Sequence, residues 1–352
     1  MREFLANKTN PELLIDLGPK VFESATVDTN ILLFAKSNDN TGKTCSCIAK
    51  EGCRNDLSGF FRQHATECAF TTSDSWVILS PIEQSIKQKI EAIGTPLKDW
   101  DIKINRGILT GCNDAFIIDE AKKEELIKED PKSAEIIRPI LRGRDIKRYG
   151  YDFAGLYLIA THNGIPEKGI PRIKIDDYPA IKRHLNKYKR EINARYDKGD
   201  TPYNLRSCAY WEDFSKPKIV WGNLCLSAQF SYTEERFFIN APSPMIVPGN
   251  KYILAVLNSK LGDWYIRHLG VIRNGGYFEY KPMFIERLPI PQIAINKQKH
   301  FVAVVDNILT SKNNCKSTKR NQSLLDEMVF QLYGLTAEEI SYILSFRSAE
   351  VV

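Results

Sequence analysis

Short segments with the two-residue period of strands alternate in this chain with longer segments that have the period of helices. The pattern predicts strands at residues 155–160, 218–222 and 236–239, and helices at 81–93, 120–129, 178–196 and 251–269. Helical periodicity also dominates from residue 296 onward, and Thr336 with Glu339 predicts a capping box at the start of a last short helix. We therefore expect a mixed α/β fold, of the α+β kind, with a mixed sheet, flanking helices and a C-terminal helical segment.

Composition limits the class of protein. With 352 residues, 43% of them hydrophobic, the chain is long enough for two domains with ordinary cores. No stretch reaches the roughly 18 apolar residues of a membrane span, and the first residues lack the basic and apolar regions of a secretory signal. We expect no membrane association and a cytoplasmic location, where the eight cysteines stay reduced.

The N-terminal part contains too few elements to form a domain alone. After a short helix, apolar strands are expected at residues 12–17 and 30–35. Two strands cannot bury both faces of a sheet, so this part needs a partner surface or the remainder of a domain. Residues 41–75 are polar and lack clear periodicity. We therefore expect four parts, at 1–40, 41–75 (a linker or insertion), 76–295 and 296–352.

A glycine-punctuated stretch, NRGILTGCNDAFIID at residues 105–119, contains two apolar runs. Gly107 and Gly111 bracket the first run, and residues 115–118 form the second. This spacing predicts a strand, a tight turn and a second strand. Such a hairpin would hold the polar side chains of its turn away from a rigid base. The turn does not by itself identify what those side chains contact.

Positive charge is concentrated in one part of the chain. The total is +6, but residues 138–206 hold 16 Lys or Arg against 8 Asp or Glu, a balance of +8. Interleaved with these cations are Tyr149, Tyr151, Tyr157, Tyr178, Tyr188, Tyr196 and Tyr203. This mixture favours binding to a polyphosphate backbone, through counterion release and hydroxyl contacts. A solvated face on a lysine-rich protein explains the same pattern, and charge alone does not separate the two.

Patterns typical of catalysis or metal binding are scarce. None of the five histidines stands in a nucleophile or metal-helix motif. One cluster offers the ligand types that zinc prefers, namely Cys45, Cys47, Cys53 and Cys68 with His64. Because it contains no Cys-x-x-Cys pair, a loop that carries unrelated thiols is the preferred interpretation.

Polar residues on turns are the candidates for contact with nucleic acid. Arg pairs with guanine and Asn with adenine because their donors and acceptors match the base edges, whereas Lys and Tyr commonly hold phosphates. The candidate set is Thr110, Asn113, Arg142, Arg144, Lys147, Arg148, Arg206, Arg273, Asn274, Tyr277 and Lys281. For each of them the alternative is an ordinary turn residue.

Several motifs occur in an order that resembles a known family. They are GILTGCNDAFIID, IIRPILRGRDIKRY, LNSKLGDWYIR, GGYFEYKPMFIERLPIPQ and DEMVFQLYGLTAEEI. Together they resemble the specificity domain of TaqI-like and type IIG adenine-N6 DNA methyltransferases, and more distantly the target-recognition domains of type I restriction specificity subunits. The resemblance implies that residues 76–295 form a target-recognition domain for double-stranded DNA, with a methyltransferase catalytic domain or subunit as partner.

The resemblance also indicates what this chain lacks. The segment KVFESATVDTNILLFAKS is similar to the last strands of the family's catalytic domain, so residues 1–40 are expected to be a remnant of it. The family binds S-adenosylmethionine on a glycine-rich turn and holds a flipped adenine with an Asn-Pro-Pro-Tyr loop, and neither pattern occurs here. We expect no catalytic residue, metal or cofactor in this chain, and S-adenosylmethionine in the complete enzyme.

Three functional hypotheses remain open. The first is a DNA-binding specificity module of a restriction-modification adenine-N6 DNA methyltransferase, which reads a target sequence for a catalytic domain that this chain lacks. The second is the C-terminal part or a subunit of an active methyltransferase or type IIG restriction enzyme. The third is an inactive remnant, because fold and function are separable.

Overall fold

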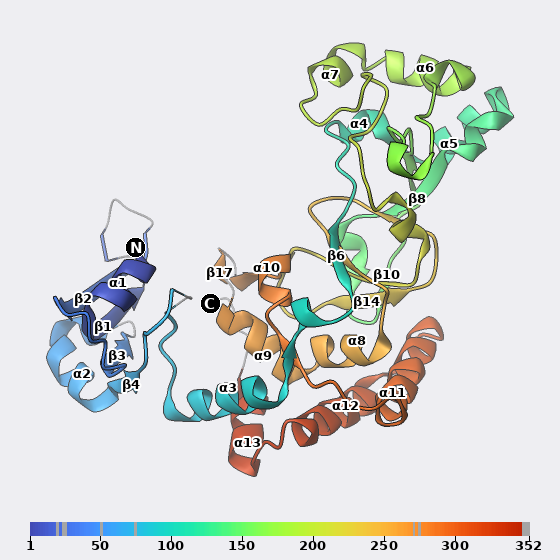
Figure 1. The fold of residues 1–352 in the computed structure, drawn as a ribbon. Coiled ribbons are helices and arrows are strands. Elements are labelled where there is room, and N and C mark those ends of the chain that lie inside the picture. Colours follow the sequence, from blue (N-terminus) through green and yellow to red (C-terminus); the bar gives the residue numbers. More distant parts are fainter. Residues whose placement is uncertain are drawn as a thin grey trace. The chain divides into compact units, whose positions relative to one another are not determined.

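The computed structural model describes residues 1–18, 21–22, 27–49, 52–73, 76–269, 272–273 and 276–346. The chain divides into two compact units, Met1–Lys89 and Ile90–Val352. Figure 1 follows it from the N-terminal sheet to the C-terminal helices. Both units mix helices with strands, and the strands form several small sheets, so the predicted mixed α/β class is confirmed.

The N-terminal unit is built on a four-stranded sheet with the order β2-β1-β3-β4. Its elements are α1 (Arg2–Lys8), β1 (Asn10–Gly18), β2 (Thr29–Ala35), β3 (Thr44–Ile48), a 3₁₀ turn (Cys53–Asp56), α2 (Leu57–His64) and β4 (Thr66–Cys68), followed by α3 (Pro81–Ile93) at the boundary of the units. β1 runs antiparallel to β2 and parallel to β3. The two strands expected in residues 1–40 are therefore confirmed.

Residues 41–75 differ from the expected linker. They supply β3 and β4, which complete the sheet that β1 and β2 begin. Sequence periodicity missed β3 because its five residues, TCSCI, carry few large apolar side chains. β3 forms because it pairs with β1. A small core of Leu14, Cys68 and Phe70 then covers part of the sheet, and Trp76 stacks on Phe70 with ring centroids 4.9 Å apart.

The C-terminal unit carries two four-stranded sheets, ordered β14-β12-β16-β6 and β15-β8-β11-β7. The strands of these sheets are β6 (Lys103–Arg106), β7 (Ile117–Asp119), β8 (Ile137–Leu141), β11 (Leu156–Ile159), β12 (Lys218–Trp221), β14 (Phe230–Thr233), β15 (Phe238–Ile239) and β16 (Pro244–Val247). All four residues of β12 are buried. Neighbouring elements therefore cover both of its faces, as is usual for a central strand in a mixed fold.

Short ribbons and helices surround these sheets. The ribbons are β5 (Thr95–Pro96) with β19 (Pro289–Ile290), β9 (Ile146–Lys147) with β10 (Gly150–Tyr151), and β13 (Leu224–Cys225) with β18 (Tyr277–Glu279) and β17 (Ile272–Arg273). The helices are α4 (Asn113–Phe116), α5 (Glu120–Glu129), α6 (Pro179–Asn186), α7 (Lys189–Ala194), α8 (Lys251–Asn258), α9 (Lys260–Leu269), α10 (Pro282–Ile285), α11 (Ile295–Asn313), α12 (Lys319–Leu332) and α13 (Ala337–Ser345). No helix of the described residues is long and apolar enough to cross a membrane.

The hairpin predicted within residues 105–119 is wrong. β6 pairs with β16 and β7 pairs with β11, so the strands on either side of the glycines belong to different sheets and do not pair with each other. Between them Ile108 forms a parallel bridge to Asn240, and the short helix α4 occupies the predicted second half of the turn. The long-range partner strands outcompeted the local pairing that the glycines suggested.

Two expected helices are interrupted. The helix predicted at 178–196 divides into α6 and α7, and the one at 251–269 divides into α8 and α9 at Ser259. The Ser259 hydroxyl donates to the Val256 carbonyl and accepts from the Gly262 amide at 3.0 Å, so it ends one helix and begins the next. Gly262 is required at this corner, because a Cβ there would lie 2.1 Å from the Val256 carbonyl oxygen.

The C-terminal helical segment is confirmed, although it belongs to the same compact unit as the residues before it. α11 packs on α8, and α12 packs on α9 and α11. Gly334 ends α12 with a φ of +63°, and Thr336 begins α13 through the predicted capping box with Glu339. The boundary expected at residue 295 is therefore a change of composition within one folded unit.

A buried lysine at the start of the central strand generates a testable pH dependence. Lys218 is 0% exposed, and its ammonium donates to the carbonyls of Phe214, Lys216 and Glu235 at 2.7 to 3.2 Å. Burial lowers the pKa of Lys218 from 10.5 to about 8. Between these values the unfolded chain binds more protons than the folded chain, so the free energy of unfolding should rise with pH, by up to about 3 kcal/mol.

Denaturant unfolding of the native chain and of Lys218→Met, measured between pH 7.5 and pH 10, checks this prediction. The range is chosen because the folded and unfolded chains differ in the protonation of Lys218 at roughly pH 8 to 10. The rise should be present in the native chain and reduced in the variant, since methionine retains the apolar stem without the charge. Parallel curves for the two proteins would mean that the three carbonyls hold the ammonium protonated throughout.

Gly107 provides a second prediction, on the connection between the sheets. A Cβ at this position would lie 2.5 Å from the Ile239 carbonyl oxygen and 2.7 Å from the Ser243 carbonyl oxygen. Both contacts are to backbone, which cannot rotate away, so Gly107→Ala should lower the free energy of unfolding by about 1 to 3 kcal/mol. The matched control is Gly150→Ala, whose Cβ would meet only the Lys312 side chain at 3.7 Å. Equal stability of the two variants would contradict the close approach.

Candidate nucleic-acid interface

Two hollows flank the segment that leaves β6, and both are lined by Ile108 and Leu109. One has a volume of about 300 Å³ and is further lined by Arg106, Gly107, Arg206, Ser207, Cys208 and Tyr210. The other has a volume of about 270 Å³ and is further lined by Thr110, Gly111, Cys112, Asn113, Asn240 and Ala241. We call the two hollows and the segment between them the 106–113 groove. Its rim carries amide, hydroxyl and guanidinium groups.

Thr110 and Asn113 have different roles in this groove. Thr110 is 2% exposed and its hydroxyl donates to the Asn113 side-chain oxygen at 2.6 Å. Asn113 is exposed and occupies the first position of α4. The buried hydroxyl therefore fixes the direction of an exposed amide. Of these two predicted residues, only Asn113 presents its side chain to solvent, and Thr110 supports it.

Arg206 reaches the other hollow from the loop that follows α7. Its side chain is exposed and donates to the Asp197 carboxylate at 2.8 Å. This surface ion pair leaves further N–H groups of the guanidinium open to an acceptor. Arg106, which sequence reasoning did not single out, is exposed in the same hollow. It directly precedes Gly107, so the glycine stretch itself was the available signal.

Asn240 is the groove residue that sequence analysis had no means of finding. It lies far along the chain from the glycine stretch and is brought there by its bridge to Ile108. Its neighbour Ala241 donates its amide to the Ile108 carbonyl at 3.0 Å. Such pairing between distant segments leaves no local pattern in a single sequence.

The basic turn after β8 contains one arginine that pairs with a carboxylate and one that is exposed. The Arg142 guanidinium donates to both carboxylate oxygens of Asp145, at 2.8 and 2.9 Å, and its amide donates to the same carboxylate. Burial acts to raise the pKa of Asp145, but the hydrogen bonds from Arg142 outweigh it and the pKa is lowered. Arg142 therefore holds the turn together, whereas Arg144 is exposed, with no hydrogen bond from its side chain to a described residue.

Lys147 and Arg148 point to different surroundings. The Lys147 ammonium donates to the Arg144 carbonyl at 2.8 Å and remains half-exposed. Arg148 donates inward to the Asn258 carbonyl, with its guanidinium 5.5 Å from the centre of the Tyr149 ring. The geometry therefore places Arg148 in the packing of α8 and makes it a poor candidate for a phosphate contact.

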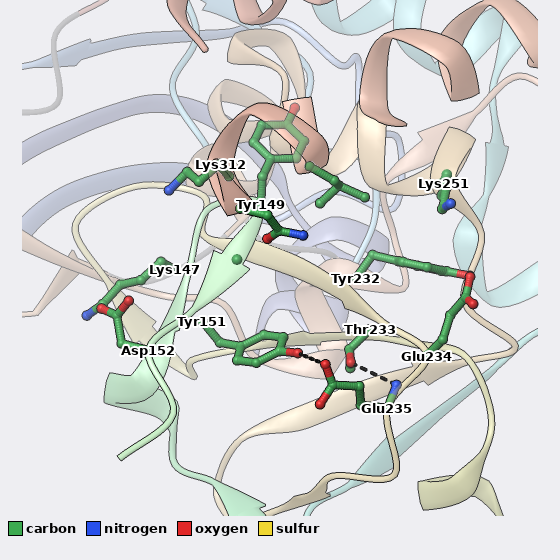
Figure 2. Close-up of a pocket in the computed structure, with 13 residues that line it drawn as sticks. Lys147, Tyr149, Tyr151, Asp152, Tyr232, Thr233, Glu234, Glu235, Lys251 and Lys312 are labelled. Atoms are coloured by element: carbon green, nitrogen blue, oxygen red, sulfur yellow. Dashed lines mark hydrogen bonds between the residues drawn. The ribbon is translucent and has the colours of Figure 1, made fainter. Parts of the chain in front are cut away.

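Lys147 also lines a cavity of about 560 Å³ between the β9–β10 ribbon, β14 and α11 (Figure 2). Lys147 and Lys312 lie at one end, and Lys251 and Glu234 at the other. Several of its polar groups satisfy one another, since Tyr151 donates to Glu235 at 2.9 Å and Lys251 pairs with Asp306 at 2.7 Å. The cavity offers mixed charge with no preference for an anion.

The second predicted turn is described only in part. Tyr277 is 44% exposed on β18, and its partner in the ribbon is Arg273 on β17, whose side chain is not among those described. Asn274 lies outside the described residues. The Lys281 ammonium pairs with the buried Glu279 carboxylate at 2.7 Å. On this turn, the side chains of Tyr277 and Lys281 therefore both contact solvent, and the Lys281 ammonium is engaged by Glu279.

Ion pairs engage several cations of the basic segment 138–206. Among the described residues, its cations pair as Arg142–Asp145, Lys168–Glu212, Arg172–Asp200, Lys182–Asp176, Arg183–Glu129 and Arg206–Asp197. Four of the partner carboxylates are already counted in the balance of +8, so only the pairs with Glu212 and Glu129, which lie outside the segment, offset further charge. A solvated, internally paired face therefore accounts for part of the charge, and Arg144 remains exposed.

The cysteine cluster has no metal geometry. The described residues contain no group of three or more His, Cys, Asp or Glu side chains placed to hold a metal ion. Burial raises the pKa of the Cys47 and Cys68 thiols, and the charge on Cys53 also raises that of Cys47. Both effects disfavour the thiolate form that zinc binds.

Comparison with known proteins gives this geometry a context. The chain is 23% identical over 94% of its length to the type II restriction enzyme and methyltransferase RM.Eco57I of Escherichia coli, covering 37% of that protein. It is 20% identical over 76% of its length to the type II methyltransferase M.PaeR7I of Pseudomonas aeruginosa, covering 44% of it. The chain thus spans less than half the length of these curated relatives.

A solved structure and a family model extend the comparison. The fold is similar to that of the type IIL restriction-modification enzyme MmeI, solved in complex with DNA, with a TM-score of 0.60 over 96% of this chain and 45% of that one, at 11% identity. The model of the TaqI-like C-terminal specificity domain matches residues 138–290, which include Arg206 and Asn240 of the groove. Residues 138–290 of this chain are therefore similar to a TaqI-like C-terminal specificity domain.

Proposed function

We propose that this chain is the DNA-recognition module of a restriction-modification adenine-N6 DNA methyltransferase. The observation that carries the proposal is the 106–113 groove, part of whose lining belongs to the TaqI-like specificity domain. Its exposed amide and guanidinium groups, on Asn113, Arg106 and Arg206, have the donors that base edges in the major groove accept. The preorganised Asn113 amide is suited to direct readout.

Phosphates and bases would be contacted by different residues. Arg144, exposed and with no side-chain hydrogen bond to a described residue, and the half-exposed Lys147 would bind phosphates and set the register on the duplex. The groove residues would then meet base edges. Tyr277, exposed on the β17–β18 ribbon, adds a hydroxyl that can bind a phosphate or stack.

The catalytic partner is proposed to pack on the N-terminal unit. Edge strand β2 exposes Ile31, Leu33 and Phe34, the last two by 55% and 46%, and Phe4 on α1 is 61% exposed. An edge strand with large apolar side chains is a site for pairing or burial against another surface. A methyltransferase catalytic domain or subunit is the partner that the relatives favour, since their own length extends well beyond the region matched here.

S-adenosylmethionine does not fit the residues of this chain. No two of its 20 glycines are separated by a single residue, so the sequence lacks a Gly-x-Gly turn. The first strand, β1, is paired antiparallel with β2, the next strand in the chain. We therefore propose that the complete enzyme obtains this cofactor from the catalytic partner. The alternative is an active enzyme of which this chain is the C-terminal part or a subunit. In that case too, S-adenosylmethionine would be bound outside this chain.

Fluorescence anisotropy with a labelled mixed-sequence duplex tests the function, with salt varied from about 50 to 200 mM and an unrelated competitor in excess. Binding that weakens with salt, and that persists under competition for a subset of sequences, is expected. Absence of binding at the lowest salt would contradict an independent recognition module and favour either a module that requires its catalytic partner or an inactive remnant.

The turn 142–145 yields a prediction that separates phosphate contact from structure. Arg144→Ala should lower the slope of log K against log salt by about 1, because one phosphate contact is lost. Arg142→Ala should instead destabilise the fold by roughly 1 to 3 kcal/mol, since it leaves the buried Asp145 carboxylate without its partner. Salt titrations and denaturant unfolding of both variants check this. An unchanged slope for Arg144→Ala would remove this turn from the DNA-contact surface.

A further inference from the structure

A buried arginine connects the two sides of the groove. Arg195 follows α7 and is 4% exposed. Its guanidinium donates to the carbonyls of Thr110 at 2.5 Å, Pro202 at 2.7 Å and Asn204 at 2.9 Å, and its Nε lies 3.4 Å from the Ile192 carbonyl. Among the described residues, the hydrogen-bond acceptors of the Arg195 guanidinium are therefore main-chain carbonyls.

These carbonyls belong to the segments that carry the groove residues. Thr110 directly precedes the turn that presents Asn113, in the hollow of about 270 Å³. Pro202 and Asn204 precede Arg206, in the hollow of about 300 Å³. One side chain therefore joins the loop of the first hollow to the loop of the second.

The turn at Gly111 is also packed against this side chain. Gly111 has a φ of +66°, and a Cβ there would lie 3.1 Å from Cδ of Arg195. The guanidinium lies 4.4 Å from the centre of the Phe116 ring on α4. Burial lowers the pKa of Arg195, which is the expected effect of removing a cation from water. Such a group persists where the surrounding structure compensates it, here through oriented carbonyls and an aromatic face.

We propose that Arg195 is a positioning residue that fixes the distance between Asn113 and Arg206, and so determines which base sequences the groove accepts. The inference rests on the proposed DNA-recognition function. Arg195 itself touches no DNA, because it is buried beneath both loops. Its effect is on the sequence preference, whereas the exposed Arg144 and Lys147 govern the sequence-independent attraction.

The chemistry of the site requires a guanidinium. Five N–H donors in a rigid plane can serve carbonyls on two loops at once, whereas the three donors of an ammonium radiate from one atom. Arg195→Lys keeps the charge and most of the apolar stem, so it should release one loop from the other while the fold remains. The matched control is Arg190→Lys, the same substitution at an exposed position of α7.

Hydrogen exchange of the free protein provides the first test. In Arg195→Lys, amides in both 108–113 and 202–206 should exchange faster, by roughly tenfold, which corresponds to the loss of one or two hydrogen bonds. Arg190→Lys should match the native chain. Faster exchange in one loop alone, or in neither, would overturn the proposal, because the two loops would then be held independently.

Selection from a randomised duplex pool provides the second test. Arg195→Lys should bind the pool with the native salt slope but enrich a less defined sequence, and Asn113→Ala should lose preference at part of the same sequence. An unchanged enriched sequence in Arg195→Lys would reject the positioning role. If no protein, including the native chain, binds the pool at any salt, the proposed function fails, while the exchange result still decides whether Arg195 couples the loops.

A second variant keeps the proposal testable if Arg195→Lys does not fold. Gly111→Ala places a methyl group against the Arg195 stem and disfavours the positive φ of the turn. The rate of amide hydrogen exchange should then rise at 202–206 as well as at 108–113, because the added methyl group displaces Arg195 and the guanidinium contacts both loops. A change confined to 108–113 would show that Arg195 does not link the two loops.

Discussion

The C-terminal unit depends on one backbone crossing, where residues 103–108 lie beside residues 239–247. β6 pairs antiparallel with β16 as far as Arg106, and the Gly107 and Ile108 amides then donate to the carbonyls of Ser243 and Ile239 at 2.9 and 2.6 Å. The crossing connects the two four-stranded sheets, since β16 belongs to one and β15 to the other. The same residues form the floor of the 106–113 groove. The geometry that unites the sheets therefore also sets the candidate reading surface.

Electrostatics in this protein is more local than its composition suggests. Many cations of the basic segment are satisfied by neighbouring carboxylates, and such exposed pairs contribute little to stability. Their consequence is functional, because a paired cation is less available to a phosphate.

The two compact units have complementary character. The C-terminal unit buries large aromatic side chains such as Trp221 and Tyr280, which are joined by a hydrogen bond of 2.7 Å from the indole to the Tyr280 carbonyl. The N-terminal unit has a small core and an edge strand with exposed apolar side chains. This contrast agrees with the proposal that a catalytic partner covers the exposed side chains of the N-terminal sheet.

Local patterns in the sequence predicted the mixed α/β class, several helices and the resemblance to a TaqI-like specificity domain. α3 and α5 were predicted at their observed bounds, because amphipathic periodicity is a local signal. The Thr336–Glu339 capping box was readable for the same reason, since both partners lie within one turn. The family resemblance rested on several motifs in order, and this too is contained in a single sequence.

The surroundings of each candidate residue depend on contacts between segments that are distant in the sequence. The glycine stretch is a crossing between sheets and not a hairpin, because pairing with β16 and with Asn240 replaced the local alternative. Asn113 and Arg144 face solvent, whereas Thr110 is buried and Arg142 and Arg148 are engaged within the fold. Residue type and spacing do not specify side-chain direction at a turn. That direction follows from contacts with segments far away in the sequence, which form only when the chain has folded.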